Sequence, residues 1–302
     1  MARTDTEIYR RFRGRLGGTR TSFLALARAG IAAETRRKLP MLILYAPPAI
    51  GTVIFSFVVY ARFSLQAGVT PAAIGPPSPV SAIASGFVST LIQVRDQIVL
   101  FHISMSYFTL LVIAWFGAGA IAEDRRSGAH LLYFSRPLHG SGYLAARFLS
   151  LAFFALIAVL VPPLVICTVA AFASPEWSFL KEEGRVIPAS IAYSLLWVFV
   201  WSSVMLAISS LSTRKTLALV ASFAGFALTG AVSVLLSALQ RDPRFLILGV
   251  QGNFHRIAGW MFGMRRLGLD WDVRWSWIVV LGVAALAWAV LIARVRRMEA
   301  AA

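Results

Sequence analysis

Long stretches without a charged side chain are the feature that most constrains the fold of this chain. Several of them exceed about 18 residues, which is enough for a helix to cross the hydrocarbon core of a bilayer. Of the 302 residues, 58% are hydrophobic and 14% are charged, whereas soluble domains carry roughly 25% charged residues. We therefore expect a multi-pass membrane protein built from helices.

Six spans account for the uncharged stretches and predict an all-α membrane protein with a transmembrane domain over residues 39–297. The expected spans are 39–61, 97–122, 143–171, 188–211, 216–240 and 275–293. Pro47–Pro48 and Pro162–Pro163 predict bends in the first and third spans, because proline removes a backbone donor from the helix.

The first 38 residues form a basic cytoplasmic leader rather than a further span. Ten basic residues fall within the first 40 positions, and the unbroken apolar segment of a cleavable signal peptide is absent. Residues 22–38 show helical spacing, with Phe23, Leu26, Ala27 and Ile31 on one face. This pattern predicts an amphipathic helix lying in the membrane interface, although a solvated leader fits it equally well.

Basic residues are distributed unevenly between the two faces of a six-span protein. With both termini on one face, that face holds 19 basic residues and the opposite face holds 10. The positive-inside rule then predicts cytoplasmic termini, in a plasma (inner) membrane protein. The loop 241–274 departs from this rule, because it carries six arginines and three aspartates on the outer face.

A charged segment, residues 121–147, lies between the second and third spans. It begins with two acidic residues and two arginines at 123–126, and a mostly apolar stretch leads from there to Pro137. Because a residue before proline avoids helical backbone, we expect a short helix at the membrane surface that ends near Pro137. An ordinary charged turn between two spans is the alternative interpretation.

The order of residues in this segment carries a family resemblance. The residues concerned are Glu123, Arg126, Gly128, Leu131–Leu132, Ser135–Arg136–Pro137 and Arg147. In this order they resemble the first cytoplasmic loop of permease subunits of type 2 ABC transporters, a family of exporters, and the span pattern is similar over nearly the whole chain. Two positions differ, because Ala129 replaces the usual Thr and Ala146–Arg147 replaces the usual Gly-Lys.

The resemblance implies that this loop is a coupling helix that presses on a separate ATPase subunit. Contact with the ATPase would be made by Glu123, Arg125, Arg126, Gly128 and Pro137, and Arg147 would anchor the loop to the membrane. The resemblance also implies an N-terminal elbow helix at the interface and a re-entrant hairpin within 241–274, with arms at Phe245–Val250 and Ile257–Met264.

The sequence lacks the motifs of several kinds of membrane enzyme. The four histidines form no HExxH pattern, no GxSxG motif occurs, and no acidic residue lies within an expected span. None of the three lysines follows a glycine, so the chain has no P-loop for ATP. The single cysteine, Cys167, allows neither an internal disulfide nor a cysteine metal cluster. We therefore expect no catalysis, metal or cofactor in this chain, no nucleic acid partner, and ATP with Mg²⁺ on the partner ATPase.

Small residues recur at every fourth position of the fifth span. They are Ala221, Gly225, Thr229, Ser233 and Ser237. This spacing lets helix backbones approach closely, and packing within one subunit explains it as well as a dimer seam does. The resemblance favours a subunit seam or a substrate path, because permeases of this family work as homo- or heterodimers.

The sequence and the resemblance together predict the transmembrane permease subunit of an ABC exporter, powered by a separate ATPase. The spans are apolar with scattered Ser and Thr, which suits an amphiphilic or lipid-like substrate of unidentified structure. A membrane scaffold or assembly factor without transport is the alternative.

Overall fold

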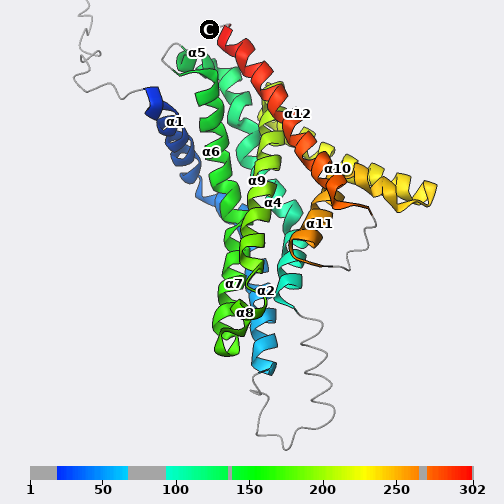
Figure 1. Ribbon diagram of the computed structural model, residues 1–302. Helices are drawn as coiled ribbons and strands as arrows, with labels where there is room; N and C mark the ends of the chain where they lie inside the picture. Colours follow the sequence, from blue (N-terminus) through cyan, green and yellow to red (C-terminus); the bar gives the residue numbers. More distant parts are fainter. Residues whose placement is uncertain (1–18, 67–92, 135–137, 265–270, 301–302) are drawn as a thin grey trace, which may run out of the picture.

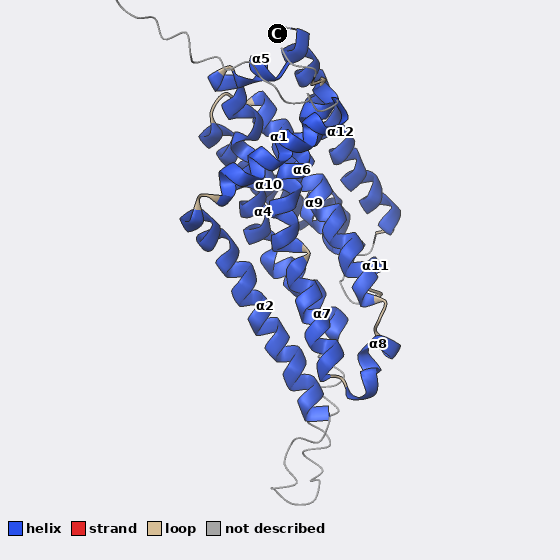
Figure 2. Cartoon of the chain, turned by 90° about the vertical axis from the view of Figure 1, so that its left-hand side faces the viewer, coloured by secondary structure: helices blue, strands red, loops and turns tan. Residues whose placement is uncertain are grey.

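A computed structural model describes residues 19–66, 93–134, 138–264 and 271–300, which are helical almost throughout and contain no strand (Figures 1 and 2). The helices, in chain order, are α1 (Thr19–Thr35), α2 (Lys38–Gln66), α4 (Val94–Ser127), α5 (Ala129–Phe134), α6 (Gly140–Val159), α7 (Val161–Ala173), η3 (Pro175–Trp177), α8 (Ser178–Glu182), α9 (Val186–Leu211), α10 (Lys215–Gln240), η4 (Pro243–Leu248), α11 (Val250–Met261) and α12 (Val273–Ala300). The predicted leader, 1–18, lies outside the described residues.

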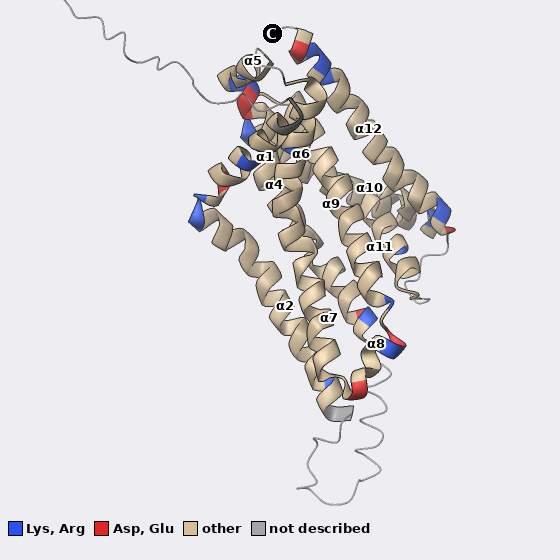
Figure 3. Cartoon of the chain, turned by 60° about the vertical axis from the view of Figure 1, so that its left-hand side comes forward, with Lys and Arg blue, Asp and Glu red and all other residues tan. Residues whose placement is uncertain are grey.

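Six of these helical segments are long and apolar enough to cross a membrane, which confirms the six-span prediction. They are α2, α4, α6 with α7, α9, α10 and α12. The third is interrupted at Leu160, two residues before Pro162 and Pro163, where the sequence predicted a bend. Charged residues lie mainly near the ends of the long helices, which are uncharged over most of their length (Figure 3).

Several helices extend beyond the apolar stretches from which they were predicted. The second span was expected at 97–122, whereas α4 runs from Val94 to Ser127. The sixth was expected to end at 293, whereas α12 continues to Ala300. Glu, Arg and Ala are good helix formers, so the helical backbone continues after the apolar run has ended. The helices are therefore longer than the bilayer requires.

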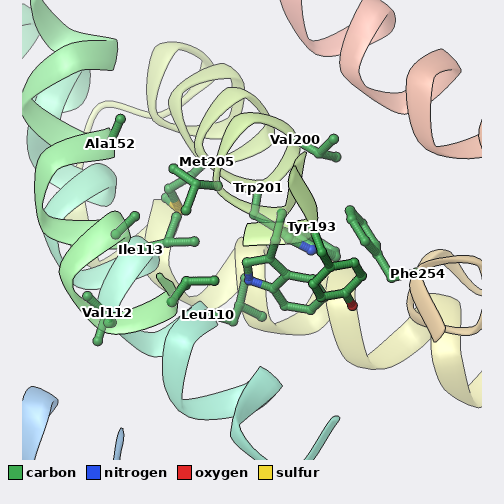
Figure 4. Close-up of a cluster of buried hydrophobic side chains, with 14 of the residues drawn as sticks. Leu110, Val112, Ile113, Ala152, Tyr193, Val200, Trp201, Met205 and Phe254 are labelled. Atoms are coloured by element: carbon green, nitrogen blue, oxygen red, sulfur yellow. The ribbon is translucent and has the colours of Figure 1, made fainter. Parts of the chain in front are cut away.

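The core lies between α4, α6 and α9. The most apolar windows of α4 and α9 are 56% and 61% buried, against 17% for α10, which projects from the bundle at one edge (Figure 1). Figure 4 shows Ile113 of α4 and Met205 of α9 in this core, beside a cluster of aromatic rings. In that cluster the rings of Trp201 and Phe254 are stacked with centroids 6.2 Å apart.

Helix α1 packs along α6 and stands apart from the other helices (Figure 1). The hydroxyl of Ser150 donates a hydrogen bond to the carbonyl oxygen of Ala27, at 3.0 Å. A Cβ added at Gly30 would lie 3.0 Å from the same hydroxyl oxygen, so the two helices approach closely there. Ala27 is buried in this contact, whereas Arg28 is exposed.

The segment between α10 and α12 contains two short helices, η4 and α11, close to the positions expected for the arms of a re-entrant hairpin. The second of these helices, α11, begins at Val250, whereas the second arm was predicted to begin at Ile257. The side-chain amide of the buried Asn253 donates to the carbonyl oxygens of Ile247 and Gly249, at 2.6 and 2.9 Å, and so fixes the turn between the two helices. Helix α11 packs against α12.

A buried ion pair joins three helices at the end of the bundle where α2 ends and α4 begins. The guanidinium of Arg62 lies 3.2 Å from the carboxylate of Glu183, which follows α8. The same carboxylate accepts a hydrogen bond from the backbone N–H of Arg95, at 3.1 Å, in the first turn of α4. A carboxylate in that position satisfies a free helix donor and interacts favourably with the helix dipole.

Candidate functional site

The charged segment 121–147 lies at the end of the bundle that holds α5 and the C-terminal end of α12, called the α5 end below (Figure 1). The sequence predicted one short surface helix here. Instead, residues 123–127 continue α4, and the helix stops at Gly128, which has a φ of +72°. That left-handed conformation suits glycine and is a common way for a helix to end. The separate short helix α5 follows and reaches Phe134.

A buried acid–base contact holds this segment to the bundle. The carboxylate of Asp124, which is 8% exposed, forms an ion pair with Arg147 on α6. It also accepts a hydrogen bond of 2.6 Å from the hydroxyl of Tyr143, one helical turn before Arg147. The guanidinium lies over the rings of Tyr133 and Tyr143, 5.8 and 5.6 Å from their centroids. α4, α5 and α6 are thus joined at one point.

This contact changes the role expected for Arg147. The sequence predicted that Arg147 anchors the loop to the membrane, but its guanidinium pairs with Asp124 inside the protein. Asp124 was not among the predicted site residues. The sequence did contain a signal for this contact. Tyr143 and Arg147 lie 19 and 23 residues after Asp124, and because they are four residues apart they share one face of a helix.

Helix α9 is also joined to the end of α4, through hydrogen bonds of Ser209 and Ser210. The backbone N–H groups of Ile121 and Ala122 both donate to the hydroxyl of Ser209, at 3.1 Å, and that hydroxyl donates to the carbonyl oxygen of Ala118, at 2.8 Å. The guanidinium of Arg125 donates to the carbonyl oxygen of Ser210, at 2.6 Å. Arg125 is therefore engaged in a contact within the chain.

Two of the predicted contact residues and the two leucines of α5 lie on the surface of the α5 end. Glu123 and Arg126 are exposed on the last turns of α4. Leu131 and Leu132 on α5 are 45% and 70% exposed. Pro137, the last residue predicted to contact an ATPase, lies outside the described residues. The described surface therefore combines charged and apolar side chains on a rigid base.

A polar cavity of about 210 Å³ lies between α1, α4 and α6, beside the end of α4. Its lining includes Glu34 of α1, Glu123 and Asp124 of α4, Arg147 of α6 and Lys215 at the start of α10. The ammonium of Lys215 lies 4.8 Å from the ring centroid of Trp115. Charged groups of four helices thus meet where α1 approaches the end of α4.

The row of small residues on α10 is divided between two environments. Ala221, Gly225 and Thr229 are exposed, and a Cβ added at Gly225 would meet no atom within 4 Å. Ser233 is buried, because Gly249 lies against it, and a Cβ added at Gly249 would be 2.6 Å from the Ser233 hydroxyl. Ser237 is partly buried. Packing within the described subunit therefore accounts for Ser233 but not for the first three positions.

A larger, mainly apolar cavity of about 790 Å³ lies beside the same helix. Its walls come from α10, η4 and α11, together with Tyr107 of α4. Ser233, Gln251 and His255 are among its polar lining residues. The side chain of Gln251 is held by a 2.9 Å hydrogen bond to the hydroxyl of Ser106, and burial lowers the pKa of His255 to about 4. The cavity is suited to a ligand with a long apolar part.

Within the described ranges, no group of three or more His, Cys, Asp or Glu side chains is arranged to hold a metal ion. A comparison with protein-family models found a match to the family described as ABC-2 family transporter protein, over residues 82–251. The match covers more than half of the chain and includes the whole of α4 to α10. A comparison with curated proteins found no match.

Proposed function

This chain belongs to the ABC-2 family of transporter proteins, and from that premise we propose that it is the permease subunit of an ATP-driven exporter. The motor is a separate ATPase subunit that carries ATP and Mg²⁺. The sequence of this chain supports a separate motor, because its three lysines are not part of a phosphate-binding P-loop.

The observation that carries this proposal is the rigid attachment of an exposed surface at the α5 end. A coupling element has to transmit force without yielding, so it needs fixed attachment on its inner side and exposed side chains on its outer side. Asp124, Arg125 and Ser209 supply the attachment through buried contacts with α6 and α9. Glu123, Arg126 and Leu131 supply the exposed surface.

The proposed ATPase contact has two chemical parts. Leu131 and Leu132 offer apolar area to a cleft of the partner, and such area contributes about 25 cal/mol per Å² when it is buried. Glu123 and Arg126 offer charges of both signs, which set the orientation of the contact through charge-assisted hydrogen bonds. Gly128 permits the sharp turn between the two parts because it adopts a left-handed backbone conformation.

In the proposed orientation, the α5 end and both termini lie in the cytoplasm of a plasma (inner) membrane protein. The distribution of basic residues, 19 against 10, supports this orientation. Helix α1 then acts as an elbow helix in the cytoplasmic interface, which is consistent with the exposed Leu24 and Arg28 on the faces that α6 does not cover.

A second permease subunit completes the proposed transporter. Ala221, Gly225 and Thr229 form an exposed strip along α10 that permits close approach of another helix. The 790 Å³ cavity lies beside this strip, so a substrate held there would lie next to the seam. Its apolar walls and few polar groups favour an amphiphilic or lipid-like substrate.

The experiment that tests coupling uses the variants Glu123→Arg and Gly128→Trp. Both sites lie outside the long apolar stretches, so we expect folded protein that loses co-purification of the ATPase subunit or loses transport-linked ATP hydrolysis in lipid. Reversal of a charge in a buried contact costs about 2–5 kcal/mol. Glu182→Arg, an exposed acid at the opposite end of the bundle, is the matched control. Full complex formation and full hydrolysis by both variants would show that this loop is not the coupling element.

A further inference from the structure

A basic cavity of about 320 Å³ lies at the α5 end, on the side of the segment that faces α12. Two arginines of α4, Arg125 and Arg126, and two of α12, Arg294 and Arg297, line it. His130 of α5 also lines it. Figure 3 shows basic residues of α12 and of the α4–α5 segment gathered at this end of the molecule. Charges that are far apart in the sequence are thereby concentrated in one place.

The positive charge of this cavity is not neutralised by nearby acids. No carboxylate lines the cavity, and within the described part of the chain none of its four arginines forms an ion pair. Two acids near these arginines in the sequence, Asp124 and Glu299, have partners outside the cavity. Asp124 pairs with Arg147, and the carboxylate of Glu299 accepts the backbone N–H of Gly140, at 3.3 Å. An anion is therefore the ligand that this cavity favours.

The cavity is also held in shape by contacts around it. Arg125 is fixed by its hydrogen bond to the carbonyl oxygen of Ser210, and His130 by a 3.1 Å hydrogen bond from its Nδ1 to the carbonyl oxygen of Asp124. On α12, Val295 and Met298 are 2% and 9% exposed, so they seat the helix against the bundle. Arg294 and Arg297 are three residues apart and share one helix face beside these anchors.

The position of the cavity along the long axis of the helices indicates which class of anion it binds. The uncharged stretch of α12 ends at Ala293, and Arg294 follows it directly. The cavity therefore lies where an apolar membrane-spanning stretch gives way to charge, which is the level of lipid headgroups. Arg126, Arg297 and Thr213 are exposed, so the cavity is accessible from outside the bundle. Basic pockets between membrane helices at this level are suited to phosphate-bearing headgroups.

We propose that this cavity is a binding site for the phosphoryl headgroup of an anionic phospholipid. A headgroup bound there connects α12 to the α4–α5 segment through their arginines. This inference concerns a ligand of the permease itself and does not depend on the proposed ATPase contact, because it rests on the cavity and its charges alone.

The test measures lipid binding by the full chain purified in a non-ionic detergent. The probes are dioctanoyl phosphatidylglycerol, dioctanoyl phosphatidylcholine and inorganic phosphate, each titrated separately. The variant is Arg294→Gln/Arg297→Gln. The matched control is Arg244→Gln/Arg274→Gln, which removes the same charge from two exposed arginines outside the cavity. If the double variant does not fold, the single variant Arg297→Gln, at an exposed position, carries the test.

We expect phosphatidylglycerol to bind more tightly than phosphatidylcholine, and its Kd to rise about tenfold or more in the Arg294→Gln/Arg297→Gln variant but little in the control. Equal weakening in both double variants would overturn the proposal, because net charge alone would explain it. Equally tight binding of inorganic phosphate would also overturn it, since the site would then serve a free anion. Loss of ATPase co-purification with unchanged lipid affinity would identify the cavity as a protein interface, and so overturn it too.

Discussion

At the scale of single residues, the contact between Asp124 and Arg147 decides how the α5 end is held. Two charges removed from water stabilise a protein only when they are well paired and hydrogen-bonded. Here Asp124 has Arg147 and the Tyr143 hydroxyl as partners, and the guanidinium lies over two aromatic rings. Removal of one partner therefore leaves the other as an uncompensated buried charge.

We predict that Asp124→Ala lowers the free energy of unfolding by about 3–5 kcal/mol. The double variant Asp124→Leu/Arg147→Met should cost less than Asp124→Ala, because it removes both charges and keeps apolar volume. Thermal unfolding in detergent measures both effects. Asp272→Ala is the control, since its ion pair with Arg274 spans 3.9 Å between exposed side chains and should contribute about 0–1 kcal/mol. A double variant less stable than Asp124→Ala would contradict this explanation.

His255 provides a second prediction at the residue scale. Burial in the wall of the 790 Å³ cavity lowers its pKa from 6.5 to about 4. Below pH 6.5 the unfolded chain binds a proton that the folded chain does not bind. Stability is therefore lost as the pH falls from 6.5 toward 4, by about 2 kcal/mol at pH 5, and is unaffected by this group above pH 7.

The measurement for His255 is the change in Tm between pH 7.5 and pH 5. We expect a smaller decrease in His255→Gln than in the wild type, because glutamine has no proton to gain in this range. His139→Gln, at an exposed position, should keep the decrease of the wild type. An identical decrease in His255→Gln and in the wild type would exclude His255 as the source.

At the scale of helices, two glycines within long apolar helices have opposite surroundings. Gly117 lies on α4 in the core, where an added Cβ would be 2.5 Å from Met205 Cγ and 2.8 Å from Leu151 Cδ2. Gly225 lies on α10 with nothing within 4 Å of an added Cβ. Small residues at helix contacts let backbones approach closely in membranes, so Gly117 sets the distance between α4, α6 and α9, whereas Gly225 leaves a surface free.

The variants Gly117→Leu and Gly225→Leu should therefore have different effects. Gly117→Leu overpacks the core and should lower stability by about 1–3 kcal/mol or more, measured by thermal unfolding. Gly225→Leu should leave the stability of one subunit nearly unchanged and should abolish cross-linking between cysteines placed on α10 of two subunits. A dimer cross-link of normal yield in Gly225→Leu would place the seam elsewhere.

At the scale of the whole molecule, the uncharged stretches are enough to predict six spans, because bilayer thickness imposes a length that local composition reveals. The ends of the helices are not predictable in this way. Residues 123–127 form part of α4 because Glu and Arg are compatible with a helix, and only the backbone of Gly128 ends it.

In the candidate site, too, some features could be predicted from the sequence and others could not. Glu123 and Arg126 were predicted from their order in the sequence and lie exposed, as a contact surface requires. The inward contacts of Asp124 and Arg125 were missed, because their partners on α6 and α9 are 19 to 87 residues away. No local pattern specifies such pairs; they arise only when the helices are packed.

The orientation of the whole molecule is the last prediction. If the positive-inside rule governs this chain, Thr213 between α9 and α10 lies in the cytoplasm, and Asp272 before α12 lies outside. Both residues are exposed, so a cysteine at either position is accessible once the correct side of the membrane is reached. The background is Cys167→Ala, which removes the only native thiol. In intact cells, a membrane-impermeant maleimide should label Asp272→Cys, and it should label Thr213→Cys only after permeabilisation. The six arginines of 241–274 make this loop the strongest challenge to the rule. Labelling of Thr213→Cys in intact cells, with Asp272→Cys protected, would invert the topology and place the α5 end away from any cytoplasmic ATPase.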